Sequence, residues 1–246
     1  MLCSRDKVCS FYCAYCQLGK TKQHTTKRKR FVSIEKMMHE LSSALNKVDA
    51  DVITFSGTGE PTLAKNLDEA IKATRRITDL QLAILTNGSL LYVKDVRTAL
   101  CKLDIVVAKL DAPNQSLFQE INRPVASIRF ENILDGLKEF RKEFSGKLAL
   151  EMMFIDENRE YADRLAMLAR DIKPDEIQLN TPLRPSPKKP LSPKQMESLE
   201  KLFEGLPIIS VYKCKKPIVK FLNKDEVLRR RGISQLRTSP NIGKAF

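Results

Sequence analysis

Three cysteines near the N-terminus are the residues whose types and spacing point most clearly to chemistry. Cys9, Cys13 and Cys16 lie in the segment Cys-Ser-Phe-Tyr-Cys-Ala-Tyr-Cys. Three thiolates this close together can hold one metal centre, and cysteines of one short loop are poorly placed to pair as disulfides. A structural zinc site normally has four protein ligands, whereas an iron cluster held by three cysteines leaves one iron open to an outside ligand. The odd number of ligands favours the iron cluster.

Other interpretations of the cysteine loop stay open. Cys3 or His24 could complete a zinc site, and the three cysteines could also have a purely structural role. Cys3, Cys101 and Cys214 are scattered along the chain and could build a second cluster. Cys101 ends an apolar helical stretch, however, and a free cysteine in such a place usually behaves as a small core residue.

The charge of the chain indicates what kind of partner it attracts. Its 246 residues include 43 Lys and Arg against 30 Asp and Glu, and the net charge of +13 favours phosphates, nucleic acid or acidic proteins. Basic residues gather in two groups, which are Lys20, Lys22, Lys27, Arg28, Lys29 and Arg30, and later Lys213, Lys215, Lys216 and Lys220. These groups predict RNA as a partner, although such runs more often form a solvated basic surface.

Nothing in the sequence predicts a membrane protein or a secreted one. No apolar run approaches the roughly 20 residues that span a bilayer. Arg5, Asp6 and Lys7 stand where a signal peptide would need an apolar core. With 42% hydrophobic and 30% charged residues, the chain is expected to form one globular core. We therefore expect a soluble, cytoplasmic protein.

The elements that must position these residues follow from the hydrophobic pattern. Short apolar runs rich in Val, Ile and Leu alternate with longer amphipathic stretches, which is typical of repeated strand–helix units. The predicted strands are 51–56, 80–85, 104–109, 148–154, 176–179 and 208–212. The predicted helices are 34–47, 63–77, 93–100, 130–144, 159–172 and 193–204. Ser33 and Ser192 are expected to cap the first and the last of these helices.

Near-continuous apolar strands separated by helices indicate a parallel sheet. Such a sheet forms a full or partial barrel or stays open and doubly wound, and the hydrophobic period does not separate these. In each case ligands bind at the carboxyl ends of the strands. The site is therefore expected in the loops after Phe55, Leu85, Lys109, Phe154 and Leu179. We expect one core domain over residues 1–222 and a C-terminal tail over residues 223–246.

Two motifs resemble those of a known enzyme superfamily. The cysteine motif, with Tyr15 directly before its last cysteine, resembles the cluster-binding signature of radical S-adenosylmethionine (radical SAM) enzymes. The segment Ser56-Gly-Thr-Gly-Glu-Pro61 is similar to the Gly-Gly-Glu motif of the same superfamily. The resemblance covers about residues 3–230. It implies an α/β fold, a partial (β/α)6 TIM-like barrel with parallel strands, whose first strand is short or truncated in this chain.

Further segments narrow the resemblance to a subgroup. The chain looks like small, single-domain radical SAM proteins, mostly prokaryotic, that are loosely related to wyosine-type tRNA-modifying enzymes. The segments that support this are Thr86-Asn-Gly88, Lys109-Leu-Asp111, Ile121-Asn-Arg-Pro124 and Gln178-Leu-Asn-Thr-Pro182. A cysteine set for the second cluster of true wyosine synthases is not found in the sequence.

The resemblance assigns a role to each motif. Cys9, Cys13 and Cys16 would hold a [4Fe-4S] cluster, and S-adenosylmethionine would chelate its free iron. The residues expected to bind this cofactor are Tyr15, Gly57, Thr58, Gly59, Glu60, Pro61, Asn87, Lys109, Asp111 and Asn180. The residues expected to act in catalysis are Lys109, Asp111 and Arg123.

The residue types at these positions suit such a ligand. Glycines let backbone approach a ligand closely, and main-chain carbonyls or the Glu60 carboxylate can accept hydrogen bonds from an ammonium group. Arg123 could bind a carboxylate or phosphate, although Pro124 also predicts a helix end there. Glu151 is an ionisable group in an apolar strand, which makes it a further candidate. Asn87 with the glycine after it is also typical of an ordinary turn.

The resemblance also implies a reaction. A reduced cluster passes one electron to S-adenosylmethionine, which releases methionine and a 5′-deoxyadenosyl radical that abstracts hydrogen from the substrate. The expected substrate is an RNA base, the expected electron donor is a flavodoxin or ferredoxin, and the protein is expected to be a monomer. A radical activase of a protein or peptide partner is the alternative enzyme. A non-catalytic zinc- or RNA-binding protein is the alternative outside enzymes.

Overall fold

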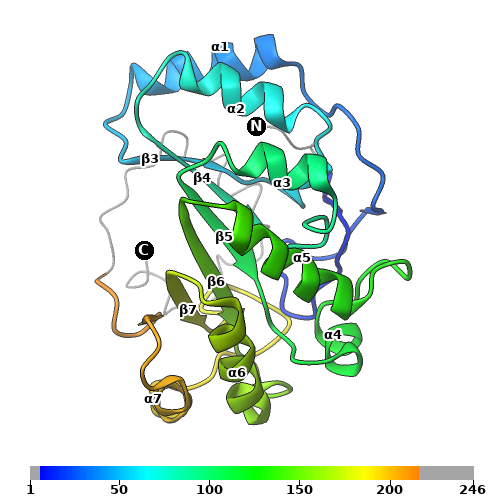
Figure 1. Cartoon of the computed structure of the whole chain (residues 1–246), viewed down its shortest axis with the longest axis vertical. Coiled ribbons are helices and arrows are strands. Elements are labelled where there is room, and N and C mark those ends of the chain that lie inside the picture. Colours follow the sequence, from blue (N-terminus) through cyan, green and yellow to red (C-terminus); the bar gives the residue numbers. More distant parts are fainter. Residues whose placement is uncertain (1–5, 216–246) are drawn as a thin grey trace, which may run out of the picture.

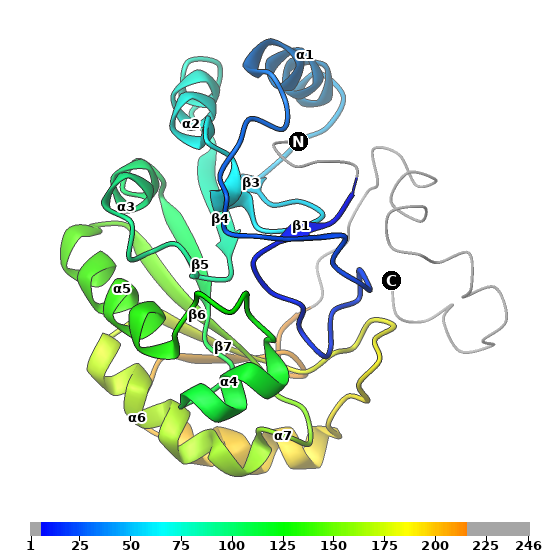
Figure 2. The same cartoon turned by 90° about the vertical axis from the view of Figure 1, so that its right-hand side faces the viewer.

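The computed structural model describes residues 6–215, and its helices lie on the outer side of one main sheet (Figure 1). Figure 2 shows these helices as an arc around the strands, with the N-terminal segment on the inner side of the arc. That segment holds β1 (Val8–Cys9), which pairs in parallel with β2 (Gln23–His24). The predicted tail at 223–246 and two of the predicted basic residues, Lys216 and Lys220, lie outside the described residues.

The main sheet consists of six strands. They are β3 (Val52–Phe55), β4 (Gln81–Thr86), β5 (Ile105–Lys109), β6 (Lys147–Met153), β7 (Glu176–Asn180) and β8 (Ile208–Ser210). Their order in the sheet is their order in the chain, and every neighbouring pair is parallel. A doubly wound sheet would reverse its order at a switch point, so this order identifies a partial barrel. The predicted fold class is confirmed, and all six predicted strands are present.

The helices follow the strands as the periodicity predicts. Within residues 6–215 they are α1 (Ile34–Leu45), α2 (Leu67–Arg75), α3 (Lys94–Leu100), α4 (Gln115–Ile121), α5 (Phe130–Glu143), α6 (Ala162–Ile172) and α7 (Pro193–Glu200). The predicted N-caps are confirmed, because Ser33 Oγ accepts a hydrogen bond from Lys36 N and Ser192 forms a capping box with Gln195.

Helix α4 and the short strands β1 and β2 are not among the predicted elements, although Pro124 predicts the helix end at which α4 stops. Helix α4 has seven residues, and no strand separates it from α5, so the alternation of strands and helices does not indicate it. Its local signal is the cap, because Asn114 Oδ1 accepts a hydrogen bond from Leu117 N at 3.0 Å. Helix α2 begins four residues later than predicted, after a 3-10 turn at Pro61–Leu63.

The two faces of the sheet differ in polarity. Alternate residues such as Ile84, Val106 and Leu150 are fully buried in the apolar core. Successive side chains of a strand point to opposite faces, so residues one position further on face the inner side. Those include Leu85, which is 44% exposed, and the polar pair Lys109 and Glu151. The inner side therefore holds the ionisable groups of the strand ends.

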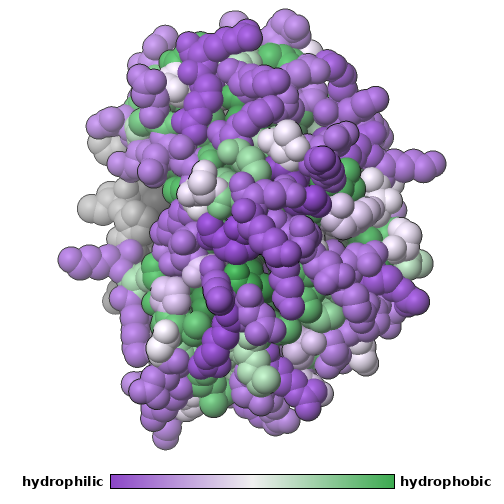
Figure 3. Space-filling model, in the orientation of Figure 1, coloured by the Kyte–Doolittle hydropathy of each residue, from purple (hydrophilic) through white to green (hydrophobic). Residues whose placement is uncertain are grey.

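The outer surface is mostly polar. Figure 3 shows a largely hydrophilic face with scattered apolar side chains. The exposed large apolar side chains include Met167 and Tyr92. Among residues 6–215 there is no helix with the length and apolar character needed to cross a bilayer.

Candidate radical SAM site

The cysteine loop is fixed to the end of helix α4 by backbone hydrogen bonds. Cys9 is the last residue of β1, and Cys13 and Cys16 follow in the loop. Tyr12 N donates to Asn122 O at 3.0 Å, and Ala14 N donates to Ile121 O at 2.7 Å. The Ile-Asn-Arg-Pro segment therefore lies directly against the cysteine loop, although more than a hundred residues separate the two in the chain.

Gly59 lets the Gly-Thr-Gly-Glu segment approach β1 closely. A Cβ atom at position 59 would lie 1.8 Å from the Val8 carbonyl oxygen and 2.6 Å from its carbonyl carbon, so a side chain does not fit without a backbone shift. Glu60 N donates to the same oxygen at 3.0 Å. The close approach that the glycines predict is thus made to the strand that ends in Cys9.

Glu60 is buried, and the protein's own donors occupy both of its carboxylate oxygens. Oε1 accepts hydrogen bonds from Thr62 N at 3.0 Å, Thr62 Oγ1 at 2.7 Å and Thr86 Oγ1 at 2.6 Å. Oε2 accepts from Asn87 N at 2.7 Å. Burial raises the pKa of this carboxyl, and the four hydrogen bonds oppose the shift. Glu60 therefore ties the loop after β3 to the end of β4.

Asp111 is the centre of a buried network after β5. Its Oδ2 accepts hydrogen bonds from the Tyr15 hydroxyl and from Asn122 Nδ2, the latter at 2.7 Å. Its Oδ1 accepts from Met153 N at 2.9 Å. Burial raises the pKa of Asp111, while the charge of Lys109 and these hydrogen bonds lower it. The network joins the cysteine loop to the ends of β5 and β6.

Lys109, Glu151 and Asn180 form a polar row at the ends of β5, β6 and β7. Lys109 Nζ lies 3.2 Å from Glu151 Oε2, and Asn180 Nδ2 donates to Glu151 Oε1 at 3.1 Å. The ammonium of Lys109 also lies 5.3 Å from the centre of the Tyr15 ring. The Lys109 charge holds the pKa of Glu151 below its usual value, against the effect of burial. The row thus places a positive charge beside the cysteine loop.

Burial makes two of the three thiols weaker acids than an ordinary cysteine. It raises the pKa of Cys9 to about 12, with a further contribution from Glu60. It also raises the pKa of Cys13 to about 11, with a further contribution from Asp111. Metals bind the thiolate form, so iron that binds these residues must displace their protons.

Of the residues named for the zinc and second-cluster alternatives, His24 lies beside the cysteine loop, where it pairs with Cys9 in the β1–β2 ladder. His24 Nε2 lies 3.0 Å from the carbonyl oxygen of Ser10. Cys101 follows helix α3, Cys214 is exposed, and Cys3 lies outside residues 6–215. Within that range, no three His, Cys, Asp or Glu side chains converge on a point where a single metal ion would sit.

Arg123 lies at the exposed rim of the cysteine loop. Its backbone has a φ of 44°, and its guanidinium lies 5.7 Å from the centre of the Tyr12 ring. Its Nε donates to Glu120 O at 3.2 Å. The preceding residue, Asn122, enters the buried network instead, and sequence reasoning missed it. The Ile-Asn-Arg-Pro motif was the available signal, but a guanidinium is the more obvious anion ligand in it.

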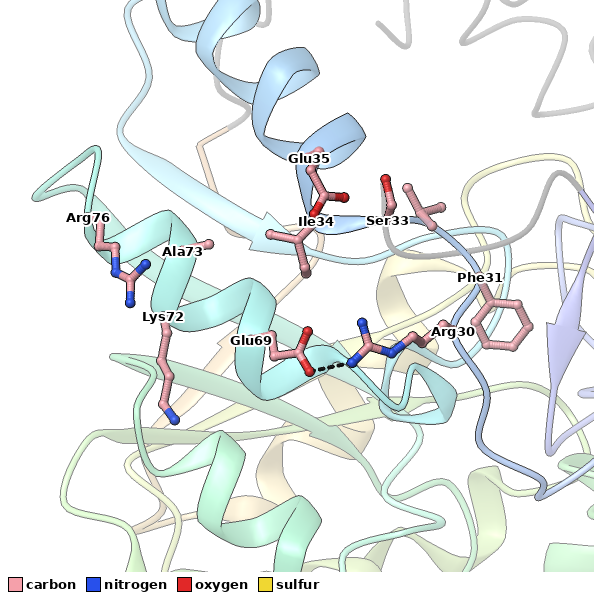
Figure 4. Close-up of a pocket in the computed structure, with 10 residues that line it drawn as sticks. Arg30, Phe31, Ser33, Ile34, Glu35, Glu69, Lys72, Ala73 and Arg76 are labelled. Atoms are coloured by element: carbon pink, nitrogen blue, oxygen red, sulfur yellow. Dashed lines mark hydrogen bonds and ion pairs between the residues drawn. The ribbon is translucent and has the colours of Figure 1, made fainter.

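One hollow of the described part of the chain adjoins the site, and another lies away from it. A groove of about 510 Å³ lies between the segment before α1 and helix α2 (Figure 4). It shares no lining residue with the cysteine loop, and Arg30 pairs with Glu69 in it at 2.6 Å. A smaller pocket is lined by residues that include Phe11, Asn87, Lys109, Asp111 and Asn122. Four polar residues of the site, Asn87, Lys109, Asp111 and Asn122, therefore line this pocket.

Comparison with known proteins identifies relatives over most of the chain. GTPase Obg of Brachyspira hyodysenteriae is 39% identical over 206 residues, which are 81% of this chain and 30% of that protein. A UPF0026 protein of Synechocystis sp. is 40% identical over 186 residues, which are 73% of this chain and 68% of that protein. The chain therefore spans about one third to two thirds of the length of these relatives.

Solved structures share the fold at low sequence identity. SuiB of Streptococcus suis, bound to S-adenosylmethionine, has a TM-score of 0.65 at 16% identity and covers 84% of this chain and 49% of its own. TYW1 with a lysine-pyruvate adduct has a TM-score of 0.58 at 18% identity and covers 82% of this chain and 71% of its own. The family model of the Radical SAM superfamily matches residues 7–169, which include the cysteine loop, Glu60 and Asp111. The chain belongs to the radical SAM superfamily of enzymes.

Proposed function

We propose that the chain binds a [4Fe-4S] cluster through Cys9, Cys13 and Cys16 and cleaves S-adenosylmethionine reductively. The observation that supports this most directly is the cysteine loop, which has three free, half-buried thiols, with Cys9 near buried Glu60 and Cys13 near buried Asp111. Three sulfur donors fit a cluster with one open iron. When bound, the cluster supplies the electron that splits a carbon–sulfur bond of S-adenosylmethionine into methionine and a 5′-deoxyadenosyl radical.

The residues around the loop bind and orient the cofactor in this proposal. Lys109 has three N–H donors, of which Glu151 takes one, so a carboxylate group can accept from the others. The main-chain carbonyls of Gly57 and Thr58 accept from the ammonium group in this proposal, because the protein's own donors already engage both Glu60 oxygens. Of the other predicted residues, Tyr15, Asn87, Asp111 and Asn180 shape the pocket through the hydrogen bonds described above.

Product analysis tests this function. Protein reconstituted anaerobically with iron and sulfide, then reduced with dithionite, should release methionine and 5′-deoxyadenosine. Cys13→Ala should lose both the bound iron and the cleavage. Cys214→Ala is the matched control, because this cysteine is exposed and should retain both. Wild-type protein that carries a cluster but forms neither product would contradict the proposal.

For the substrate, we propose an RNA base. The net charge of +13 supports it, together with the exposed Lys20, Lys22, Lys27 and Lys29 beside β2. Arg28 does not belong to this exposed group, because its guanidinium donates to the Thr62 and Ala64 carbonyls at 3.0 and 3.2 Å. An acidic one-electron donor such as a flavodoxin or ferredoxin would be attracted by the same charge. We also propose that the protein acts as a cytoplasmic monomer.

Binding to tRNA at several salt concentrations tests the substrate class. Wild-type affinity should fall steeply with salt, and the double variant Lys20→Glu/Lys27→Glu should bind more weakly with a salt slope reduced by about one per lost phosphate contact. The double variant Lys194→Glu/Lys201→Glu is the control, because it makes the same exposed charge change away from the cysteine loop. Equal binding by all three proteins would refute the role of this basic group.

Radical modification of a protein or peptide is the second candidate. It is supported by the likeness in fold to SuiB, which has also been solved with its precursor peptide SuiA at a TM-score of 0.66. The same tRNA experiment separates the two candidates. A tRNA that neither binds nor accelerates cleavage of S-adenosylmethionine would favour the peptide substrate.

A further inference from the structure

Each of the three cysteine sulfurs receives a hydrogen bond from a different side chain. The contacts are Lys7 Nζ to Cys16 Sγ at 3.0 Å, Asn87 Nδ2 to Cys9 Sγ at 3.6 Å and Asn122 Nδ2 to Cys13 Sγ at 3.6 Å. The donors come from three separate places, which are the segment before β1, the end of β4 and the end of α4. One N–H donor per sulfur is therefore a feature of the folded chain and not of the cysteine loop alone.

All three donor groups are buried and held by a second partner. Lys7 and Asn87 are each 8% exposed and Asn122 is 2% exposed. Lys7 Nζ also donates to the Gly19 carbonyl at 2.8 Å, and Asn87 Nδ2 also donates to Ser10 Oγ at 2.9 Å. An amide nitrogen has two N–H groups, so each asparagine can serve a sulfur and an oxygen at once. The second bonds hold the donors in place beside the sulfurs.

Hydrogen bonds to the cysteine sulfurs act on the redox balance of a bound cluster. The one-electron reduction of a cluster adds negative charge, part of which is borne by the sulfur ligands. Donors aimed at those sulfurs stabilise the reduced form more than the oxidised form, and this raises the reduction potential. A positive charge such as that of Lys7 acts in the same direction.

We propose that Lys7, Asn87 and Asn122 are positioning residues that set the reduction potential of the cluster through the sulfurs of Cys16, Cys9 and Cys13. This inference rests on the proposed function, because it requires a cluster on these cysteines. Phe11 N donates to Cys9 Sγ at 3.4 Å as well, but it is a main-chain group that a side-chain substitution leaves in place.

The test is a redox titration of the anaerobically reconstituted full chain, followed by the EPR signal of the reduced cluster, without S-adenosylmethionine. A low-potential one-electron reductant supplies the electron. The variants are Lys7→Met, Asn87→Leu and Asn122→Leu, and bound iron and sulfide are measured for each. At the midpoint potential of the wild type, the ratio of reduced to oxidised cluster should fall about threefold to tenfold in each variant. For one electron, this corresponds to a midpoint potential that is lower by about 28–59 mV.

Two control variants separate contact with sulfur from other effects. Lys22→Met removes a nearby positive charge that pairs with Asp6 and does not contact a cysteine sulfur. Asn66→Leu removes a buried amide whose Nδ2 donates to the Val32 carbonyl at 2.9 Å. Both controls should keep the wild-type midpoint.

The outcomes distinguish this inference from the proposed function. Loaded variants with the wild-type midpoint, or controls that shift as far as the variants, would overturn the inference and leave the proposed function standing. A wild-type chain that binds no iron–sulfur cluster would overturn both. If Asn122→Leu does not fold, because it also takes a donor from Asp111, Lys7→Met and Asn87→Leu decide the question.

Discussion

Gly59→Ala should destabilise the fold through one steric contact. The added methyl group would lie 1.8 Å from the Val8 carbonyl oxygen and 3.0 Å from its backbone nitrogen. Gly59 is not among the glycines with positive φ, so alanine carries no penalty for its backbone conformation. The whole effect should therefore come from the forced separation of the Gly-Thr-Gly-Glu segment from β1.

Two contributions give the size of this effect. Overpacking of a filled site costs about 1–3 kcal/mol. Separation of the segments also breaks the hydrogen bond from Glu60 N to Val8 O and leaves buried backbone groups unpaired, which costs about 1–3 kcal/mol more. The sum is about 2–6 kcal/mol, and for a chain of this size each kcal/mol lowers Tm by about 2–4 °C. Tm should therefore fall by about 4–24 °C.

Thermal unfolding of the cluster-free protein, followed by circular dichroism, measures this change. Gly205→Ala is the control, because Gly205 has a φ of +77° and an added Cβ there would meet no atom within 4 Å. Its cost is conformational and amounts to about 1–2 kcal/mol. A Gly59→Ala protein that loses no more Tm than Gly205→Ala would refute the steric explanation.

Two further substitutions test the polar row and a helix cap. Glu151→Gln should flatten the loss of Tm in acid: the charge of Lys109 holds the pKa of Glu151 below its ordinary value of 4.5, so the wild type gains stability above 4.5 and loses it as pH falls through the lowered pKa. Parallel Tm curves from pH 7 to pH 3 would contradict this. Ser192→Ala removes the capping box with Gln195 and should cost about 1 kcal/mol, or about 2–4 °C in Tm. Ser198→Ala, on the same helix, should change Tm less, and an equal loss would argue against the cap.

Local patterns were enough to predict the elements and the main motif. The apolar runs and amphipathic stretches have periods of two and 3.6 residues, which depend only on neighbours in the chain. All six strands and every predicted helix are therefore present, with ends shifted by a few residues. The cysteine motif is equally local, because its three cysteines lie within eight consecutive residues. The seven-residue α4 was not predicted, because it lies with α5 in one connection between β5 and β6.

The roles of single side chains depended on contacts between distant segments. Glu60 looked like a ligand residue from its motif, but Thr86 and Asn87 at the end of β4 occupy its oxygens together with Thr62. Asn122 looked like a neighbour of the more conspicuous Arg123, but it joins Cys13 to Asp111. Neither contact has a local signature, because residues far apart in the chain meet only after the strands have assembled.

The strand order is the clearest case of this division. A hydrophobic period shows which face of a strand is buried, but a barrel and a doubly wound sheet bury the same faces, so the sequence left both open. The order β3 to β8 decided for the partial barrel and brought the ends of β4, β5 and β6 to the cysteine loop. The three cysteine sulfurs come from one short stretch of chain, so the sequence alone shows them. The charges and donors around them come from distant segments, which meet only in the assembled fold.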